Sequence, residues 1–113
     1  MGGMAVNDLD LARIKKWCDA QWPEELWHEA KVEADVNGNT VTLVEVRPPW
    51  DGKGEHTRWP IARLRFTQTT GLWQLYWRDR NLKFHKYDEL PPSSTVQRLL
   101  NHITESKNPI FFG

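Results

Sequence analysis

The sequence predicts an α+β domain with an N-terminal helix, a five-stranded antiparallel meander sheet and a C-terminal helix. Apolar residues recur at helical spacing near both ends of the chain. Between them, β-branched and aromatic runs are separated by turn residues, including an Asn-Gly pair, which is the strongest short-range hairpin signal. A chain of 113 residues has room for one core, so we expect a single domain over residues 1–113, with residues 1–6 disordered or left over from expression.

The first helix is expected from Asp8 to about Gln21. Asn7 can cap its first turn, and Pro23 stops it. One face of this helix carries the apolar residues Leu11, Ile14, Trp17 and Cys18. We therefore expect Cys18 to be a buried hydrophobe rather than a nucleophile. It is the single cysteine of the chain, which excludes an intrachain disulfide and a cysteine-based zinc site.

The first two strands flank the Asn-Gly turn. Apolar and acidic residues alternate from Val32 to Val36, and a β-branched run follows from Thr40 to Val46. Apolar side chains project to both faces of the second strand, which predicts a central strand covered on both sides. Two prolines end it, and the composition of Trp50 to Trp59 is typical of a loop.

A third and a fourth strand form a hairpin from Pro60 to Asn81. A four-residue turn at Gln68 to Gly71 places residues of like character opposite one another, as an antiparallel pair requires. The predicted pairs are Phe66 with Trp73, Leu64 with Leu75, Ala62 with Trp77, Arg65 with Gln74 and Arg63 with Tyr76. The polar pairs then share one face of the sheet, together with Arg78.

A fifth strand is expected from Leu82 to Tyr87, and a helix after it completes the fold. Either Leu82 and Phe84 or His85 and Tyr87 face the core, and the pattern leaves both open. Ser94 and Gln97 predict a capping box for the helix, whose apolar stripe is Val96, Leu99, Leu100 and Ile103. The two phenylalanines of the last residues, 111 and 112, are expected to dock on the fold.

Charge and composition narrow the functional classes. Net charge is zero, but residues 1–57 carry a balance of −5 and residues 58–113 a balance of +5, so the domain can present an acidic and a basic region. Common nucleotide-binding, zincin and serine-hydrolase motifs are absent from the sequence. We expect a cytoplasmic binding domain without catalytic activity, cofactor, bound metal or membrane partner, and the oligomeric state is left open.

Candidate binding residues lie on the polar face of the hairpin. Arg63, Arg65, Tyr76 and Arg78 would form a patch of guanidinium and phenol groups, joined by Lys83, His85 and Tyr87. Guanidinium groups bind phosphates bidentately and exposed aromatic rings stack on unpaired bases, so single-stranded nucleic acid or another anionic partner, such as an acidic protein surface, is the leading hypothesis. The alternative is an ordinary solvated sheet face.

Two further functions are consistent with the sequence. A protein-interaction module would use Arg47, the two prolines after it, and Trp50. A metal-dependent nuclease would use the acidic residues Glu29, Glu33, Glu45 and Asp51 around Lys31. The second pattern is also typical of a charged strand with cross-strand ion pairs.

Four segments together resemble the bacterial family catalogued as domain of unknown function 3024. They are the R-P-P-W segment from Arg47, the A-R-x-R strand after Pro60, the W-x-L-Y-W strand from Trp73 and the aromatic-His-x-Tyr strand from Phe84. The resemblance covers Leu43 to Tyr87 closely and the flanking helices loosely. It implies no catalytic residue, because the family has no assigned activity. The chain has Leu82 where the family pattern implies a glycine.

Overall fold

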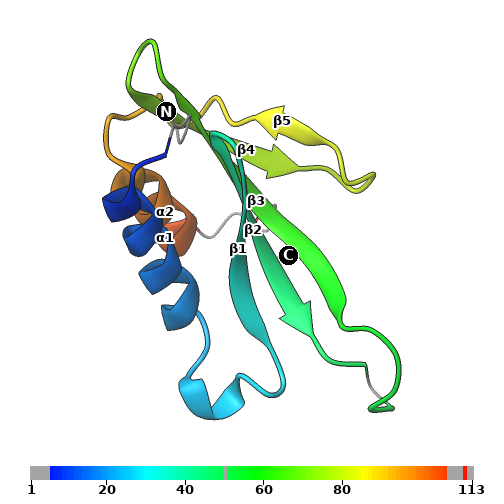
Figure 1. The fold of residues 1–113 in the computed structure, drawn as a ribbon. Helices are drawn as coiled ribbons and strands as arrows, with labels where there is room; N and C mark the ends of the chain where they lie inside the picture. The colour runs from blue at the N-terminus through cyan, green and yellow to red at the C-terminus, as the bar shows by residue number, and fades with distance from the viewer. Residues whose placement is uncertain (1–5, 50, 107–110, 112–113) are drawn as a thin grey trace.

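The computed structural model describes residues 6–49, 51–106 and 111. Its elements are α1 (Asp8–Ala20), a 3-10 turn (Glu24–Leu26), β1 (Lys31–Asn37), β2 (Thr40–Arg47), β3 (Thr57–Thr67), β4 (Leu72–Arg78), β5 (Phe84–Lys86) and α2 (Val96–Glu105). The strands form one antiparallel sheet in the order β1-β2-β3-β4-β5 (Figure 1). The predicted α+β meander between two helices is therefore confirmed. No helix in the described part of the chain is long and apolar enough to cross a bilayer.

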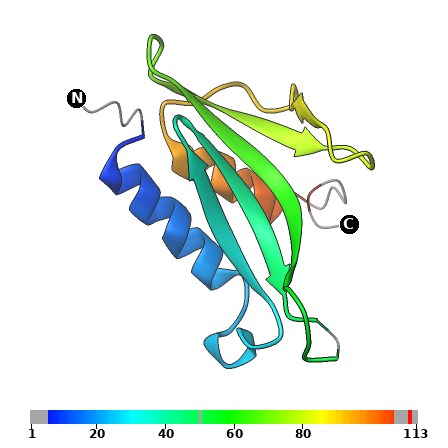
Figure 2. The ribbon, with the colours of Figure 1, turned by 45° about the vertical axis from the view of Figure 1, so that its right-hand side comes forward.

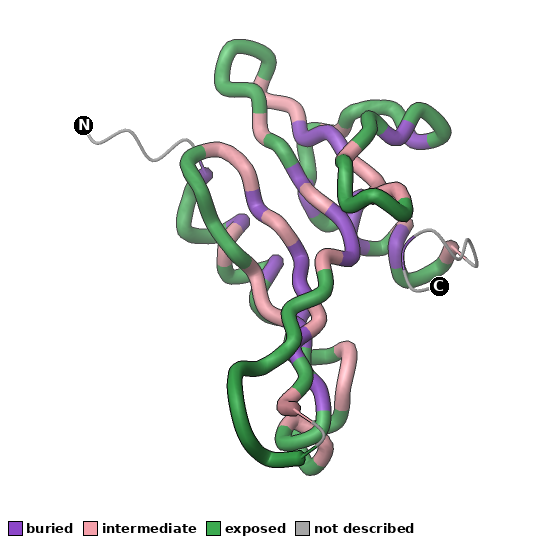
Figure 3. Tube along the Cα trace, turned by 90° about the vertical axis from the view of Figure 1, so that its right-hand side faces the viewer, coloured by how far each residue is buried: buried purple, intermediate pink, exposed green. Residues whose placement is uncertain are grey.

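Both helices cover the same face of the sheet (Figures 1 and 2). The core between them is built from both helices and from the strand residues that face them, including Ile14, Leu43, Leu64, Trp73 and Leu99, all fully buried. We call the opposite face, which is seen in Figure 3, the open face. No described element packs over it, so the exposed side chains on this face can contact a partner.

α1 begins as predicted, with the side-chain oxygen of Asn7 accepting a hydrogen bond from the Asp10 amide at 2.8 Å. Cys18 is buried, and burial raises the pKa of its thiol to about 12, so its expected role as a hydrophobe is confirmed. Val6, which belongs to the segment expected to be disordered or left over from expression, packs in the core. Residues 1–5 lie outside the described part of the chain.

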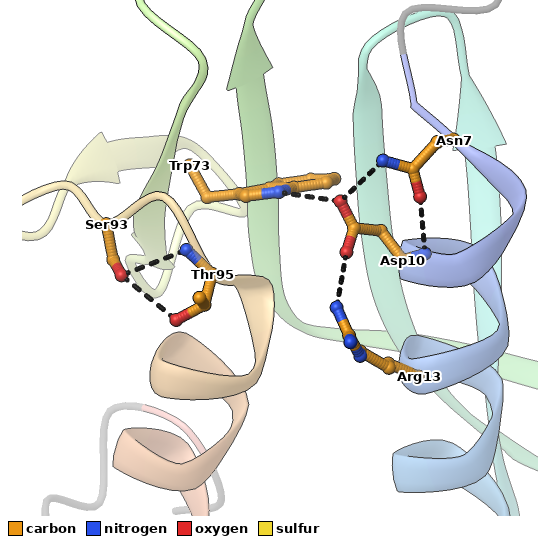
Figure 4. A network of polar contacts seen from close by, with 6 residues as sticks. All are labelled: Asn7, Asp10, Arg13, Trp73, Ser93 and Thr95. Carbon is orange, nitrogen blue, oxygen red and sulfur yellow. Dashed lines mark hydrogen bonds and ion pairs between the residues drawn. The ribbon is translucent and has the colours of Figure 1, made fainter.

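Asp10 ties α1 to the sheet (Figure 4). Its carboxylate is almost fully buried and accepts hydrogen bonds from the Trp73 indole at 3.4 Å, the Asn7 amide at 3.3 Å and Arg13 at 3.2 Å. Three donors compensate for the desolvation of this charge. Asp10 and its partner in β4, Trp73, are 63 residues apart along the chain, so no local sequence pattern identifies this contact.

The predicted β3–β4 register is confirmed at every pair, from Phe66 opposite Trp73 to Ala62 opposite Trp77. Between β2 and β3 the register shifts, because Leu43 lies opposite Ala62 while its neighbour Val44 lies opposite Pro60. Ile61 is the extra residue of this β-bulge, and both Ile61 and Ala62 are buried.

Only one face of β2 is covered by helices, contrary to the sequence expectation. Val44 and Val46 nevertheless keep 3% and 5% exposure on the open face. Val44 lies between Glu33 of β1 and Pro60 of β3. Val46 lies between Lys31 of β1 and Arg58 of β3. Long side chains of neighbouring strands therefore replace a covering layer.

The ambiguity of the fifth strand is resolved in favour of Tyr87, which is buried and stacks on Phe111 with ring centroids 5.3 Å apart. This contact confirms docking of residue 111; residue 112 lies outside the described chain. The expected capping box is wrong, because α2 begins after Thr95 and the cap makes no side-chain hydrogen bond. The Ser93 hydroxyl instead accepts from the Thr95 amide (Figure 4), and the Ser93 backbone pairs with Trp73.

Candidate functional site

The candidate site is the open face of β3, β4 and β5. Antiparallel pairing places Thr42, Arg63, Tyr76 and Lys86 in one row across four strands. The next row contains Thr40, Arg65 and Gln74, and Arg78 lies opposite Phe84 on the other side. We call the residues Arg63, Arg65, Tyr76, Arg78 and Lys86 the cationic patch.

The arginines of β3 are held differently. The Nε of Arg63 donates to the Thr42 hydroxyl at 3.0 Å, and its guanidinium lies 4.0 Å from the centroid of the Phe84 ring. Arg65 is exposed. Within the described residues, neither arginine has a carboxylate at ion-pair distance. Arg63 is therefore oriented by a hydroxyl and an aromatic ring that leave its charge uncompensated.

Arg78 lies at the corner where β3 extends past the end of β4. Its Nε donates to the Pro60 carbonyl at 2.7 Å and its Nη1 to the Asp79 carbonyl at 3.0 Å. The guanidinium lies 4.5 Å from the centroid of the Trp59 ring. Two carbonyls and one ring fix its position, and none of them neutralises its charge.

The remaining patch residues differ in availability. Tyr76 is half-buried between Arg63 and Lys86, and Lys86 is exposed. Gln74 is buried and donates to the carbonyls of Leu75 and Tyr87, so it anchors the chain after β5 rather than serving a ligand.

The expectation that His85 and Tyr87 extend the patch is wrong in its geometry. His85 lies opposite Trp77, on the other parity from Tyr76, and its ring centroid is 4.9 Å from that of Trp77. Its Nε2 is 2.7 Å from Asp79 Oδ2. Tyr87 is buried, and Lys83 precedes the strand. Lys86, which lies opposite Tyr76, is the β5 cation that joins the patch.

The other candidate binding residue, Arg47, lies apart from the patch. Its Nε donates to Glu45 at 2.7 Å, and its guanidinium lies 5.6 Å from the Trp22 ring. Trp50, the aromatic of the proposed interaction segment, lies outside the described residues.

The acidic residues of the nuclease hypothesis do not converge. Val32 is opposite Glu45 and Glu33 is opposite Val44, so Glu33 and Glu45 project from opposite faces of the sheet. Glu33 is paired with Lys31 at 3.0 Å and Arg58 at 3.0 Å, and these cations lower its pKa. No group of three metal-ligating side chains occurs within the described residues.

Sequence reasoning missed four residues around the site: Arg58, Trp59, Phe84 and Lys86. Strict alternation along β3 would turn Arg58 toward the helices, but the bulge brings it to the open face, where it pairs with Glu33 and Asp35. A shallow depression of about 450 Å³ lies between this ion-pair cluster and Arg63, with Thr42 and Val44 in its lining. The signal available in the sequence was the proline at position 60, which is typical of irregular strand positions.

A family model described as "Domain of unknown function (DUF3024)" matches residues 3–113. No curated protein and no solved structure matches the chain.

Proposed function

Because the chain belongs to the DUF3024 family, which carries no assigned activity, we propose its function from the surface alone: the cationic patch binds an anionic partner, and single-stranded nucleic acid fits it best. The observation that supports this proposal is that positive charge in the patch is not compensated by carboxylates of the described chain. Arg63, Arg65 and Arg78 have no carboxylate partner among the described residues, although acidic side chains are present elsewhere on the same face.

The chemistry of the patch suits a flexible phosphate backbone. Each guanidinium retains N–H donors that can bind phosphate oxygens, and Lys86 adds a point charge. Tyr76 supplies a ring between two cations, and the hydroxyl of a phenol does not prevent its face from stacking on a base. The patch spans adjacent strands of a twisted sheet, which is an arrangement that single strands can follow more easily than a rigid duplex.

Salt dependence provides the direct test. Each phosphate contact with a single strand contributes about −0.7 to the slope of log K against log salt concentration. If the four cations of the patch each bind one phosphate, the slope for a fluorescent oligothymidylate should be roughly −3. Arg63→Ala or Arg65→Ala should each reduce its magnitude by about 0.7. Lys16→Ala, which removes an equal charge from the exposed side of α1, is the matched control and should leave the slope unchanged.

The same titrations include the outcome that contradicts the proposal. Absence of binding at low salt, or an equal response to Arg65→Ala and Lys16→Ala, would leave the open face as a solvated surface. The variants should remain folded, because neither β3 arginine is in a buried ion pair whose loss would unfold the domain.

A further inference from the structure

Trp59 is an unusual surface residue of this protein. It keeps 49% of its area exposed, whereas Trp17 and Trp73 are buried and the other described tryptophans are at least half-buried. The four large apolar residues that are exposed in the described chain are Leu9, Val36, Trp59 and Leu82, and Trp59 is the aromatic one among them. Its hydrophobic area is not used in the core, where an indole ordinarily contributes much to stability.

The position of Trp59 is nevertheless well defined. The Arg78 guanidinium lies over the ring at 4.5 Å, and that guanidinium is itself fixed by the carbonyls of Pro60 and Asp79. No ring–ring contact within the described residues involves Trp59. An indole with one face on a cation and about half its area exposed is a preformed stacking surface.

The cation in contact with the Trp59 ring is Arg78, while Glu45, opposite Trp59 in register, is paired with Arg47. Arg78 uses Nε and Nη1 for backbone carbonyls, so its Nη2 has no hydrogen-bond partner among the described residues. Phe84, opposite Arg78 in register, stacks on Arg63 in the same way. Trp59 lies opposite Glu45, so by register it leaves the sheet on the other side from Arg63, and Arg78 is the patch residue that contacts it.

We propose that Trp59 and Arg78 form a nucleobase subsite, in which an unpaired base stacks on the free indole face and the phosphate next to it binds Arg78. This inference rests on the proposed function, since it takes the anionic partner to be a single-stranded nucleic acid. It differs from that function in requiring bases rather than charge alone. A purely electrostatic surface needs no exposed indole at its corner.

The test compares two polyanions, one with bases and one without. The probes are an oligothymidylate of about 12 nucleotides, within the range that small single-strand-binding domains cover, and inorganic polyphosphate. Trp59→Ala should weaken oligothymidylate binding roughly 5- to 150-fold, the range for loss of one stacked base, and leave polyphosphate binding unchanged. Trp59→Phe, which keeps an aromatic face, should retain most of the affinity. Arg65→Ala should weaken both ligands, because it removes charge alone.

Fluorine NMR of protein labelled with fluorotryptophan supplies a second measurement that needs no destabilising variant, with the Trp59 signal assigned by its loss in Trp59→Phe. Oligothymidylate should shift this signal more than those of the buried tryptophans, and polyphosphate should not. Equal weakening of both ligands by Trp59→Ala, or an unshifted signal on saturation with oligothymidylate, overturns the subsite and leaves the proposed function standing. Failure of the wild type to bind either polyanion overturns both.

Discussion

The two halves of the open face use the same residue type in opposite ways. On the β1 side, Arg58 is bonded to Asp35 at 2.6 Å and to Glu33 at 3.0 Å, and its charge is compensated. On the β4 side, Arg63 and Arg78 are held by a hydroxyl, backbone carbonyls and aromatic rings. Neutral partners orient these arginines but leave their charge uncompensated. The contrast is the reason for proposing that the cationic half binds an external anion.

Removal of both β3 arginines should have the largest effect on binding of a single strand. Hydrogen bonds to charged groups contribute about 1.5–3 kcal/mol each, so Arg63→Ala with Arg65→Ala should cost at least about 3 kcal/mol of binding, or roughly 100-fold in affinity. Fluorescence anisotropy with an oligothymidylate at low salt measures this loss. The paired control, Lys15→Ala with Lys16→Ala on α1, removes the same charge behind the sheet. Comparable losses in both double variants would mean that net charge, not the patch, determines affinity.

The opposite experiment removes the two negative charges that compensate Arg58, so that the β1 side also carries an arginine without a carboxylate partner. Glu33→Gln with Asp35→Asn should release Arg58, raise the affinity for a single strand a few-fold and increase the magnitude of the salt slope by about 0.7. In the wild-type background, Arg58→Ala should not reduce that magnitude, since its charge is already used. A variant with unchanged affinity and slope would show that the β1 side lies beyond the reach of the ligand.

Acid titration tests the hydrogen bonds that Asp79 accepts in the turn before β5. Hydrogen bonds from His85 and from the backbone amides of Lys83 and Asn81 lower the pKa of Asp79 to about 2. Because the ionised form is favoured in the folded state, Asp79 contributes its full stability above the unfolded pKa of about 3.9, and this contribution is lost as pH falls toward 2. Asp79→Asn should therefore flatten the dependence of unfolding free energy on pH in that window, measured by urea denaturation. An unchanged profile would mean that the hydrogen bonds to Asp79 are not maintained in solution.

The smallest expected effect concerns the turn before β5. Leu82 has φ of +66°, in the left-handed region that is costly for a residue with a Cβ, and its side chain is 50% exposed. Leu82→Gly should stabilise the domain by about 0.5–1 kcal/mol, since relief of strain exceeds the extra chain entropy of glycine. Binding of the single strand should stay unchanged, which separates affinity from stability. A lower melting temperature would indicate that Leu82 makes a packing contact worth more than the strain.

The elements and the β3–β4 register could be predicted because they depend on local alternation and on matching of facing residues. Arg63 opposite Tyr76 follows from turn length alone, and the turn at Gln68 to Gly71 was identifiable. The orientation of Arg78 was not predictable, because it depends on the Pro60 carbonyl, which the bulge of β3 leaves for its side chain. The facing of Tyr87 was also not predictable, because Leu82 with Phe84 and His85 with Tyr87 are both acceptable core pairs in the sequence.

The β-bulge at Ile61 also bears on how the sheet avoids a wrong pairing during folding. If β3 continued against β2 without the extra residue, Pro60 would lie opposite Glu45 and Arg58 opposite Arg47, two like charges facing each other directly. Arg58 would then point away from Glu33 and Asp35, so Asp35 would lose its cation and Glu33 would keep only Lys31. Repulsion in the competing register and attraction in the native one act in the same direction. The ion pairs of β1 therefore favour the native strand register over the competing one.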